Sequence, residues 1–220
     1  AALTGIEIAG VASILILGVI LLVGIGDVRI ISAIFLVLLT GVGLTLGYAT
    51  LTIGSFNTLS MLFVVMFFGL GVDFAAHLAL RLQADQATNA DTMIAAIQDM
   101  APALALCTVT SAIAFLSFTP TAYAGMAELG IISAGGMVIA LLLTLLMIPA
   151  FLTLWPPLKK PPPLTFLSVK WLPKYQTPLT LILLAAMPGA LYLASHLEFN
   201  YSVLSMRDAD APGMKALTRL

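Results

Sequence analysis

Residues 61–81 are the stretch that most constrains how this chain can fold. Twelve uncharged residues precede Asp73, and seven residues, all apolar except His77, separate it from Arg81. Extended back to Asn57, the segment is long enough to cross a bilayer as a helix, which takes about 20 residues. A carboxyl group at that depth costs roughly 2.5–3.5 kcal/mol to insert. Because spanning a membrane does not require Asp73, we expect this residue to serve a function.

The composition indicates an integral membrane protein. Of the 220 residues, 61% are hydrophobic and 9% are charged, whereas a soluble domain has about 25% charged residues. A net charge of −1 with no basic cluster argues against nucleic acid as a partner. One cysteine, Cys107, excludes an intrachain disulfide. We find no metal-ligand cluster, phosphate-binding loop or Ser/His/Asp arrangement, so the sequence predicts neither a cofactor nor an enzyme.

Apolar stretches predict six membrane-spanning helices. They cover residues 8–26, 30–53, 58–82, 101–118, 124–154 and 179–195. In the second span, Gly43 and Gly47 are four residues apart, a spacing that lets a neighbouring helix approach closely. We therefore expect a helix contact there. Asn57 is expected to cap the third span.

Residues 83–100 are more polar and are expected to lie outside the membrane core. Asn89 or Asp91 is placed to cap a short helix there. The apolar residues of this helix recur at helical spacing, which predicts a face that lies on the membrane surface. These residues are Met93, Ile94, Ile97 and Met100.

The C-terminal part of the chain changes character twice. Residues 156–178 form a basic, proline-rich connector in which Trp171 and Tyr175 suit the membrane interface. After the sixth span, residues 197–203 alternate between apolar and polar side chains, which is the pattern of a strand. We therefore predict that residues 196–220 begin a water-soluble domain. The sequence has no initiating methionine, and we expect it to be part of a longer protein.

The basic residues predict the orientation in the membrane. Those near the predicted spans all lie in the loops after the first, third and fifth spans. They are Arg29, Arg81, Lys159, Lys160, Lys170 and Lys174. Under the positive-inside rule these three loops are cytoplasmic, and residues 196–220 face outward.

Asp73 has two interpretations. Burial disfavours the charged carboxylate, which makes its protonation switchable and suits a proton-coupled carrier. The structural alternative is a protonated side chain that is hydrogen-bonded between helices. His77 lies one turn further along the same face and either relays a proton, pairs with Asp73 or packs as a neutral histidine. Gly69 and Gly71 flank the site and serve either ordinary helix packing or helix sliding.

Hydroxyl residues of the fourth span are the other part of the candidate site. Thr108, Thr110 and Ser111 either bond to the Asp73 helix or bond back to carbonyls of their own helix, which is the commoner arrangement in lipid. The first arrangement would make them members of a proton relay.

The sequence GLGVDFAAHLALR, residues 69–81, resembles the fourth transmembrane helix of the RND superfamily in its MMPL-like branch. Drug-efflux members have two adjacent acids there, whereas in this chain Phe74 follows Asp73. The next two helices of that branch are similar to APALALCTVTSAIAFLSF (101–118), TPTAYAGMAELGIISAGGM (119–137) and MIPAFLTL (147–154). These segments, together with LEFNYSVLSMRDADAP (197–212), look most like hopanoid-associated RND transporters.

This resemblance covers essentially all of the chain and implies an all-α integral membrane fold. Residues 1–155 would form a sterol-sensing-like five-helix unit, and residues 156–178 a cytoplasmic connector. Residues 179–195 would be the helix that opens the second half of the transporter. Residues 196–220 would begin its second periplasmic domain, which is of the α+β class.

The resemblance also implies a proton relay. In the family, the acid that matches Asp73 faces a second acid in the other half of the transporter, which lies outside this sequence. The relay threonine maps best onto Thr110, with Thr108 as the other candidate. His77 is a further candidate member by its position one turn from Asp73, and not by the resemblance.

The leading hypothesis is a proton-driven exporter in the bacterial inner membrane that moves hopanoids or similar apolar lipids toward the outer membrane. Its partners would be membrane lipids, protons and the second half of the same transporter, and a homo-oligomer is one assembly that the hypothesis allows. One alternative is a sterol-sensing-like module that binds lipid and regulates a partner, although a sensor needs no intramembrane acid. Another is an accessory subunit of Sec protein translocation, whose VDAN pattern is broken here at Phe74 and Ala75.

Overall fold

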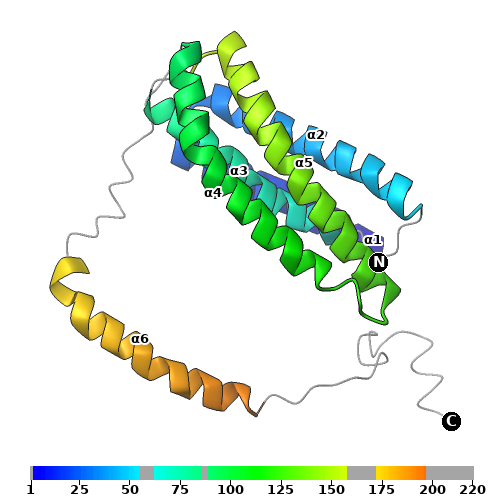
Figure 1. Ribbon diagram of the computed structural model, residues 1–220, viewed down its shortest axis with the longest axis vertical. Helices are drawn as coiled ribbons and strands as arrows, with labels where there is room; N and C mark the ends of the chain where they lie inside the picture. The colour runs from blue at the N-terminus through cyan, green and yellow to red at the C-terminus, as the bar shows by residue number, and fades with distance from the viewer. Residues whose placement is uncertain (1, 55–61, 86–88, 158–171, 197–220) are drawn as a thin grey trace. The chain divides into compact units, whose positions relative to one another are not determined.

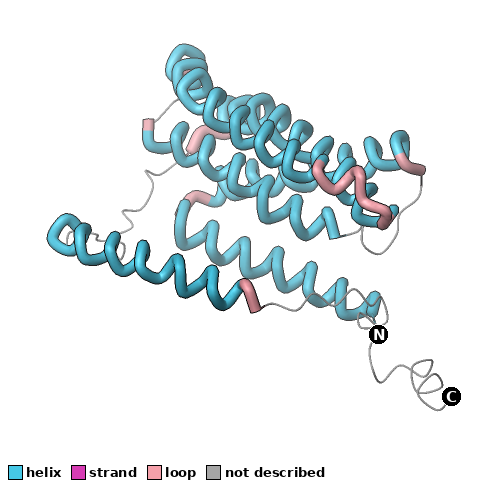
Figure 2. Tube along the Cα trace, turned by 60° about the horizontal axis from the view of Figure 1, so that its bottom comes forward, coloured by secondary structure: helices cyan, strands magenta, loops and turns pink. Residues whose placement is uncertain are grey.

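The computed structural model describes residues 2–54, 62–85, 89–157 and 172–196, which form helices and the loops between them (Figures 1 and 2). The helices are α1 (Ala2–Ile25), α2 (Val28–Thr52), α3 (Phe63–Ala84), α4 (Ala90–Leu116), α5 (Ala124–Leu154) and α6 (Leu172–Ala194). Contacts divide the chain into two units, Ala1–Leu164 with α1 to α5, and Thr165–Leu220 with α6. The predicted all-α class is confirmed for these residues, whereas the predicted strand and the Asn57 cap lie outside them.

Helices α2, α3, α4 and α5 are each long and apolar enough to cross a membrane. The apolar stretches in α1 and α6 are shorter, Ile14–Ile25 and Thr180–Ala194. The chain is therefore a multi-pass membrane protein, and the count of six spans stays a prediction.

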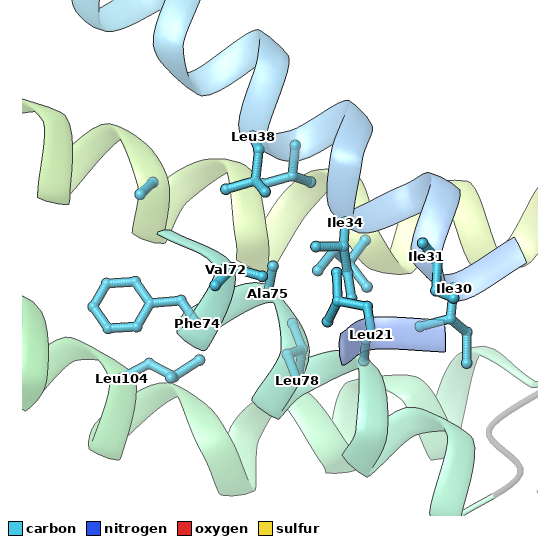
Figure 3. Close-up of a cluster of buried hydrophobic side chains, with 14 of the residues drawn as sticks. Leu21, Ile30, Ile31, Ile34, Leu38, Val72, Phe74, Ala75, Leu78 and Leu104 are labelled. Atoms are coloured by element: carbon cyan, nitrogen blue, oxygen red, sulfur yellow. The ribbon is translucent and has the colours of Figure 1, made fainter. Parts of the chain in front are cut away.

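The first five helices form one bundle in which α5 packs against α2, α3 and α4. Figure 3 shows Leu38 of α2 above Val72 and Ala75 of α3, and Phe74 of α3 beside Leu104 of α4. All five side chains are buried. Lipid tails are as apolar as leucine, so a membrane bundle of this kind depends on close van der Waals packing more than on exclusion from water. One side of α3 is thereby fixed against its neighbours.

The turn from α1 to α2 takes only two residues. Gly26 has a φ of 67°, a left-handed conformation that glycine adopts without steric cost. The Asp27 side chain accepts a hydrogen bond of 2.9 Å from the backbone N–H of Arg29 and so caps α2. The Arg29 guanidinium donates 2.7 Å to the Pro156 carbonyl and lies 5.6 Å from the ring centre of Trp155. The start of α2 is therefore tied to the end of α5.

Helix α4 contradicts the expected division into a surface helix and a separate fourth span. It runs unbroken from Ala90 to Leu116 with Pro102 inside it. Proline removes a backbone hydrogen bond, but membrane helices tolerate this where neighbouring groups satisfy the freed carbonyl. Of the expected surface residues, Met93 is buried, Ile97 and Met100 are half-buried and Ile94 is exposed. The first turns of α4 therefore pack against the bundle, which explains why the helix does not break.

The ends of the remaining helices agree in part with those predicted from the sequence. Asn89 occupies the N-cap position of α4 with extended backbone, although its side chain makes no capping hydrogen bond. Helix α5 has the predicted bounds, residues 124–154. Helix α6 begins at Leu172 rather than residue 179 and so takes in the last residues of the expected connector. Pro173 falls in its first turn, where proline is compatible with a helix.

The expected helix contact at Gly43 and Gly47 is wrong for the part of the chain that the structure describes. An ideal Cβ on either glycine would have no atom within 4 Å. Gly41 is the close-contact position of α2, because its Cβ would lie 2.5 Å from Cζ of Phe67. The buried residues Gly41 and Thr45 share one side of the helix, and Gly43 and Gly47 lie on another.

Candidate functional site

Helix α3 has one packed side and one open side. On the open side, every fourth residue from Val65 to Arg81 is exposed, and this spacing places the five residues in one row along the helix. We call this row the Asp73 face. It consists of Val65, Gly69, Asp73, His77 and Arg81.

Asp73 lies at the middle of this face. Its two neighbours in sequence, Val72 and Phe74, are both buried, whereas Asp73 itself is exposed. Among the residues that the structure describes, no hydrogen bond or ion pair is made by its carboxylate. The described part of the five-helix unit therefore does not use Asp73 to hold its helices together.

His77 lies one turn beyond Asp73, about 6 Å along the helix axis. It is exposed, and its ring makes no hydrogen bond to another described residue. Asp73 and His77 thus stand next to each other on a surface that α1 to α5 leave open. This arrangement is suited to groups that exchange protons with water or with another part of the protein.

The Asp73 face ends in a group of charges. Arg81 Nε is 3.0 Å from Asp85 Oδ2, and Arg81 Nη2 is 3.0 Å from Asp99 Oδ2 on α4. Sequence reasoning missed both acids. The four-residue spacing of Arg81 and Asp85 was a readable signal, whereas the pairing with Asp99 depends on how α3 packs against α4. The side chains are well exposed, so these pairs contribute little stability.

The two candidate threonines bond to their own helix. Thr108 is buried, and its hydroxyl donates 2.9 Å to the Leu104 carbonyl. Thr110 is exposed, and its hydroxyl lies 3.0 Å from the carbonyls of both Leu106 and Cys107. Within the described residues, neither hydroxyl is hydrogen-bonded to α3. Both threonines therefore lie on α4 and are not hydrogen-bonded to Asp73 on α3.

The two glycines beside Asp73 have different surroundings. A Cβ on Gly71 would lie 3.0 Å from Cδ2 of Leu38 and 3.4 Å from Cε1 of Phe67. Gly71 is thus a packing position on the buried side of α3. Gly69 is exposed, and a Cβ there would have no atom within 4 Å.

An apolar groove of about 340 Å³ opens between α1 and α3, one turn from Asp73. It is lined by Ile16, Leu17, Ile20, Val65, Phe68 and Gly69. A search of the described residues finds no group of three His, Cys, Asp or Glu side chains that could hold a metal ion. The site therefore combines an acid, an imidazole and an apolar wall.

Comparison with known protein families shows which family this chain belongs to. The sequence model of the MMPL family matches residues 1–175, which include α1 to α5 and every candidate site residue. The chain belongs to the MMPL family. The family resemblance drawn from residues 69–81 is therefore confirmed.

Two known proteins are similar over nearly the whole chain. One is the hopanoid transporter HpnN of Burkholderia multivorans, which is 34% identical over 98% of this chain and 25% of its own length. The other is the hopanoid transporter HpnN of Rhodopseudomonas palustris, which is 28% identical over 92% of this chain and 24% of its own length. The chain thus spans about a quarter of the length of these relatives.

Proposed function

We propose that this chain is part of a proton-driven exporter of the bacterial inner membrane, which carries hopanoids or similar apolar lipids toward the outer membrane. The two relatives named as hopanoid transporters support the lipid class. Membership of the MMPL family supports a transporter rather than an enzyme. The role of the described bundle would be to hold the acid that couples proton movement to transport.

The observation that carries this proposal is the exposure of Asp73 midway along a helix that is apolar enough to cross a membrane. If the carboxyl group served the packing of the bundle, it would be buried and hydrogen-bonded to a neighbouring helix. Asp73 is exposed instead, and no partner for it lies among the described residues. A costly group that the fold leaves unused is best explained by a function.

The proposed coupling follows from simple electrostatics. Protonation removes the charge of Asp73, and with it the cost of placing the Asp73 face against an apolar surface. Deprotonation restores that cost and favours contact with water or a cation. Each proton that moves down a membrane potential of 100 mV supplies roughly 2.3 kcal/mol.

The open Asp73 face supports a second half of the transporter as the partner of Asp73. A helix of that half would cover the face and bring a second ionisable group to Asp73. His77 would then pass protons between Asp73 and the charged group at Arg81, which we place on the cytoplasmic side by the positive-inside rule. Thr110 would join this relay only if its hydroxyl turned away from the carbonyls that it now contacts.

The test is lipid export by the full-length protein in a strain that lacks its own exporter. Asp73→Asn keeps the size and most hydrogen-bonding capacity of the side chain but removes its titration. We expect the variant to insert and fold as the wild type does and to lose export. Asp73→Glu still titrates and is expected to retain part of the activity. Wild-type export by Asp73→Asn, at equal expression, would refute the coupling role.

The second candidate function is a lipid-binding regulatory module of the sterol-sensing type. The apolar groove between α1 and α3 is the observation that favours it. In that case Gly69→Leu, which would project into the groove, should abolish regulation, whereas Asp73→Asn should leave it intact. The exporter instead predicts that Asp73→Asn abolishes function.

A further inference from the structure

The ring of Phe67 occupies a socket made by glycines. A Cβ on Gly41 of α2 would lie 2.5 Å from Cζ and 2.8 Å from Cε1 of this ring. A Cβ on Gly136 of α5 would lie 3.3 Å from its Cδ2, and one on Gly71 of α3 would lie 3.4 Å from its Cε1. Real Cβ atoms do not approach other atoms as closely as 2.5 Å. The ring can therefore sit here only because Gly41 lacks a side chain, while Gly136 and Gly71 pack closely around it.

The socket holds α3 against two helices at once. Gly41 and Gly136 lie on different helices, and Gly136 also approaches Thr45 of α2, whose Cγ2 would be 3.0 Å from an added Cβ. Helices α2 and α5 are thus in close contact at this level. A change in the socket cannot easily be absorbed by moving α2 away from α5, so it must displace Phe67 and the helix that carries it.

Beside the same ring there is a small gap of about 10 Å³. It is lined by Phe63, Met66, Phe67, Leu70, Phe115, Ser133 and Met137. The Ser133 hydroxyl is buried and has no hydrogen-bond partner among the described residues. A gap of this size has room for about one water molecule, so it cannot take up a displaced ring, and a ring that leaves the socket must shift α3 with it.

We propose that Phe67 is a positioning residue for Asp73. Its ring, which packs in the socket of Gly41, Gly71 and Gly136, sets the rotation of α3 about its axis and the position of α3 along that axis. Asp73 is six residues further along the helix, about 9 Å along the axis and roughly 120° around it. Phe67 therefore points into the bundle while Asp73 points out of it. This role rests on the proposed function, in which Asp73 is the coupling acid.

The test uses the full-length protein and two measurements. The first is the rate at which the hydrophobic carbodiimide dicyclohexylcarbodiimide labels Asp73, followed by mass spectrometry, with Asp73→Asn as the blank. The second is lipid export. Gly41→Ala would push Phe67 out of its seat, and a misplacement of about 1 Å at a reacting group can reduce rates by roughly 100-fold. We expect a labelling rate clearly different from wild type and an export rate roughly 10- to 100-fold lower.

Two further variants make the test specific. Gly43→Ala is the matched control on the same helix, because a Cβ there has no atom within 4 Å, and its labelling and export rates should equal those of wild type. Phe67→Leu removes the ring atoms with which the new Cβ of Gly41→Ala would clash. The double variant Gly41→Ala/Phe67→Leu should therefore recover labelling and export toward wild-type values. If Gly41→Ala fails to fold, Gly136→Ala, whose Cβ contact with the ring is longer, takes its place.

The outcomes separate this role from simple packing and from the proposed function. Wild-type labelling by the folded Gly41→Ala or Gly136→Ala variant would overturn the proposal. So would a double variant that recovers yield while its labelling rate stays altered. If labelling shifts and is rescued as expected but Asp73→Asn exports lipid normally, the positioning role stands and the coupling function fails.

Discussion

Arg81 on α3 is joined to Asp99 on α4 by an ion pair in which Nη2 and Oδ2 are 3.0 Å apart. The same guanidinium contacts Asp85 through Nε at 3.0 Å. The pair lies at the last turn of the Asp73 face and connects α3 to α4. It therefore limits how far α3 can move relative to α4 at this end.

We predict that Asp99→Asn has little effect on stability and a larger effect on transport. The side chains of Arg81 and Asp99 are 44% and 69% exposed, and exposed pairs contribute about 0.2–1 kcal/mol. The midpoint of unfolding in detergent should therefore change little. Export should fall if the pair restrains α3 during transport. Asp91→Asn, an exposed acid of the same helix, is the control, and equal export by both variants would contradict a role for the pair.

Gly130→Ala is predicted to destabilise the bundle. A Cβ at Gly130 would lie 2.5 Å from the carbonyl oxygen of Phe115, which belongs to the backbone of α4 and cannot rotate away. Forcing extra volume into a packed site costs about 1–3 kcal/mol. Gly43→Ala should do the reverse, since alanine is favoured over glycine in an open helix position by up to about 1 kcal/mol. An unfolding midpoint of Gly130→Ala that is unchanged or raised would refute the packing at Gly130.

The orientation can be tested by cysteine labelling. With Cys107 replaced by alanine, a cysteine at Gln98 should resist a membrane-impermeant thiol reagent added outside intact spheroplasts, because basic residues place that end of α4 in the cytoplasm. A cysteine at Thr119, in the exposed loop between α4 and α5, should react. Permeabilised cells should label both positions. The reverse pattern in intact spheroplasts would overturn the orientation.

Periodicity in the sequence located the Asp73 face but not its surroundings. Asp73, His77 and Arg81 recur every fourth residue, and a helix necessarily places them in one row. The bounds of α5 were predictable because long apolar character ends at Pro156 and Pro157. These features are local, so the sequence alone is enough to find them.

Features that depend on the packing of helices could not be read in this way. Gly43 and Gly47 have the spacing of a contact motif, yet Gly41 lies on the buried side, because the direction of a helix face depends on its neighbours. The helix capped at Asn89 was expected, but its polar residues hid its unbroken continuation into the fourth span, to which the burial of Met93 and Ala96 contributes. The pairing of Arg81 with Asp99 likewise requires two helices to be brought together.

Thr108 and Thr110 of α4 should differ in their effect on transport. Thr110 is exposed and shares its hydroxyl between two carbonyls of its own helix, so it can turn toward a group outside the bundle. Thr108 is only 3% exposed, and its hydroxyl is bonded to Leu104 within the packed interior. Thr110→Val should therefore reduce export by roughly tenfold or more, in keeping with the loss of a proton-transfer group, and should leave the unfolding midpoint unchanged. Thr108→Val should leave export near the wild-type rate. Lipid export at equal expression decides between them: loss with Thr108→Val and not with Thr110→Val would move the relay threonine to position 108.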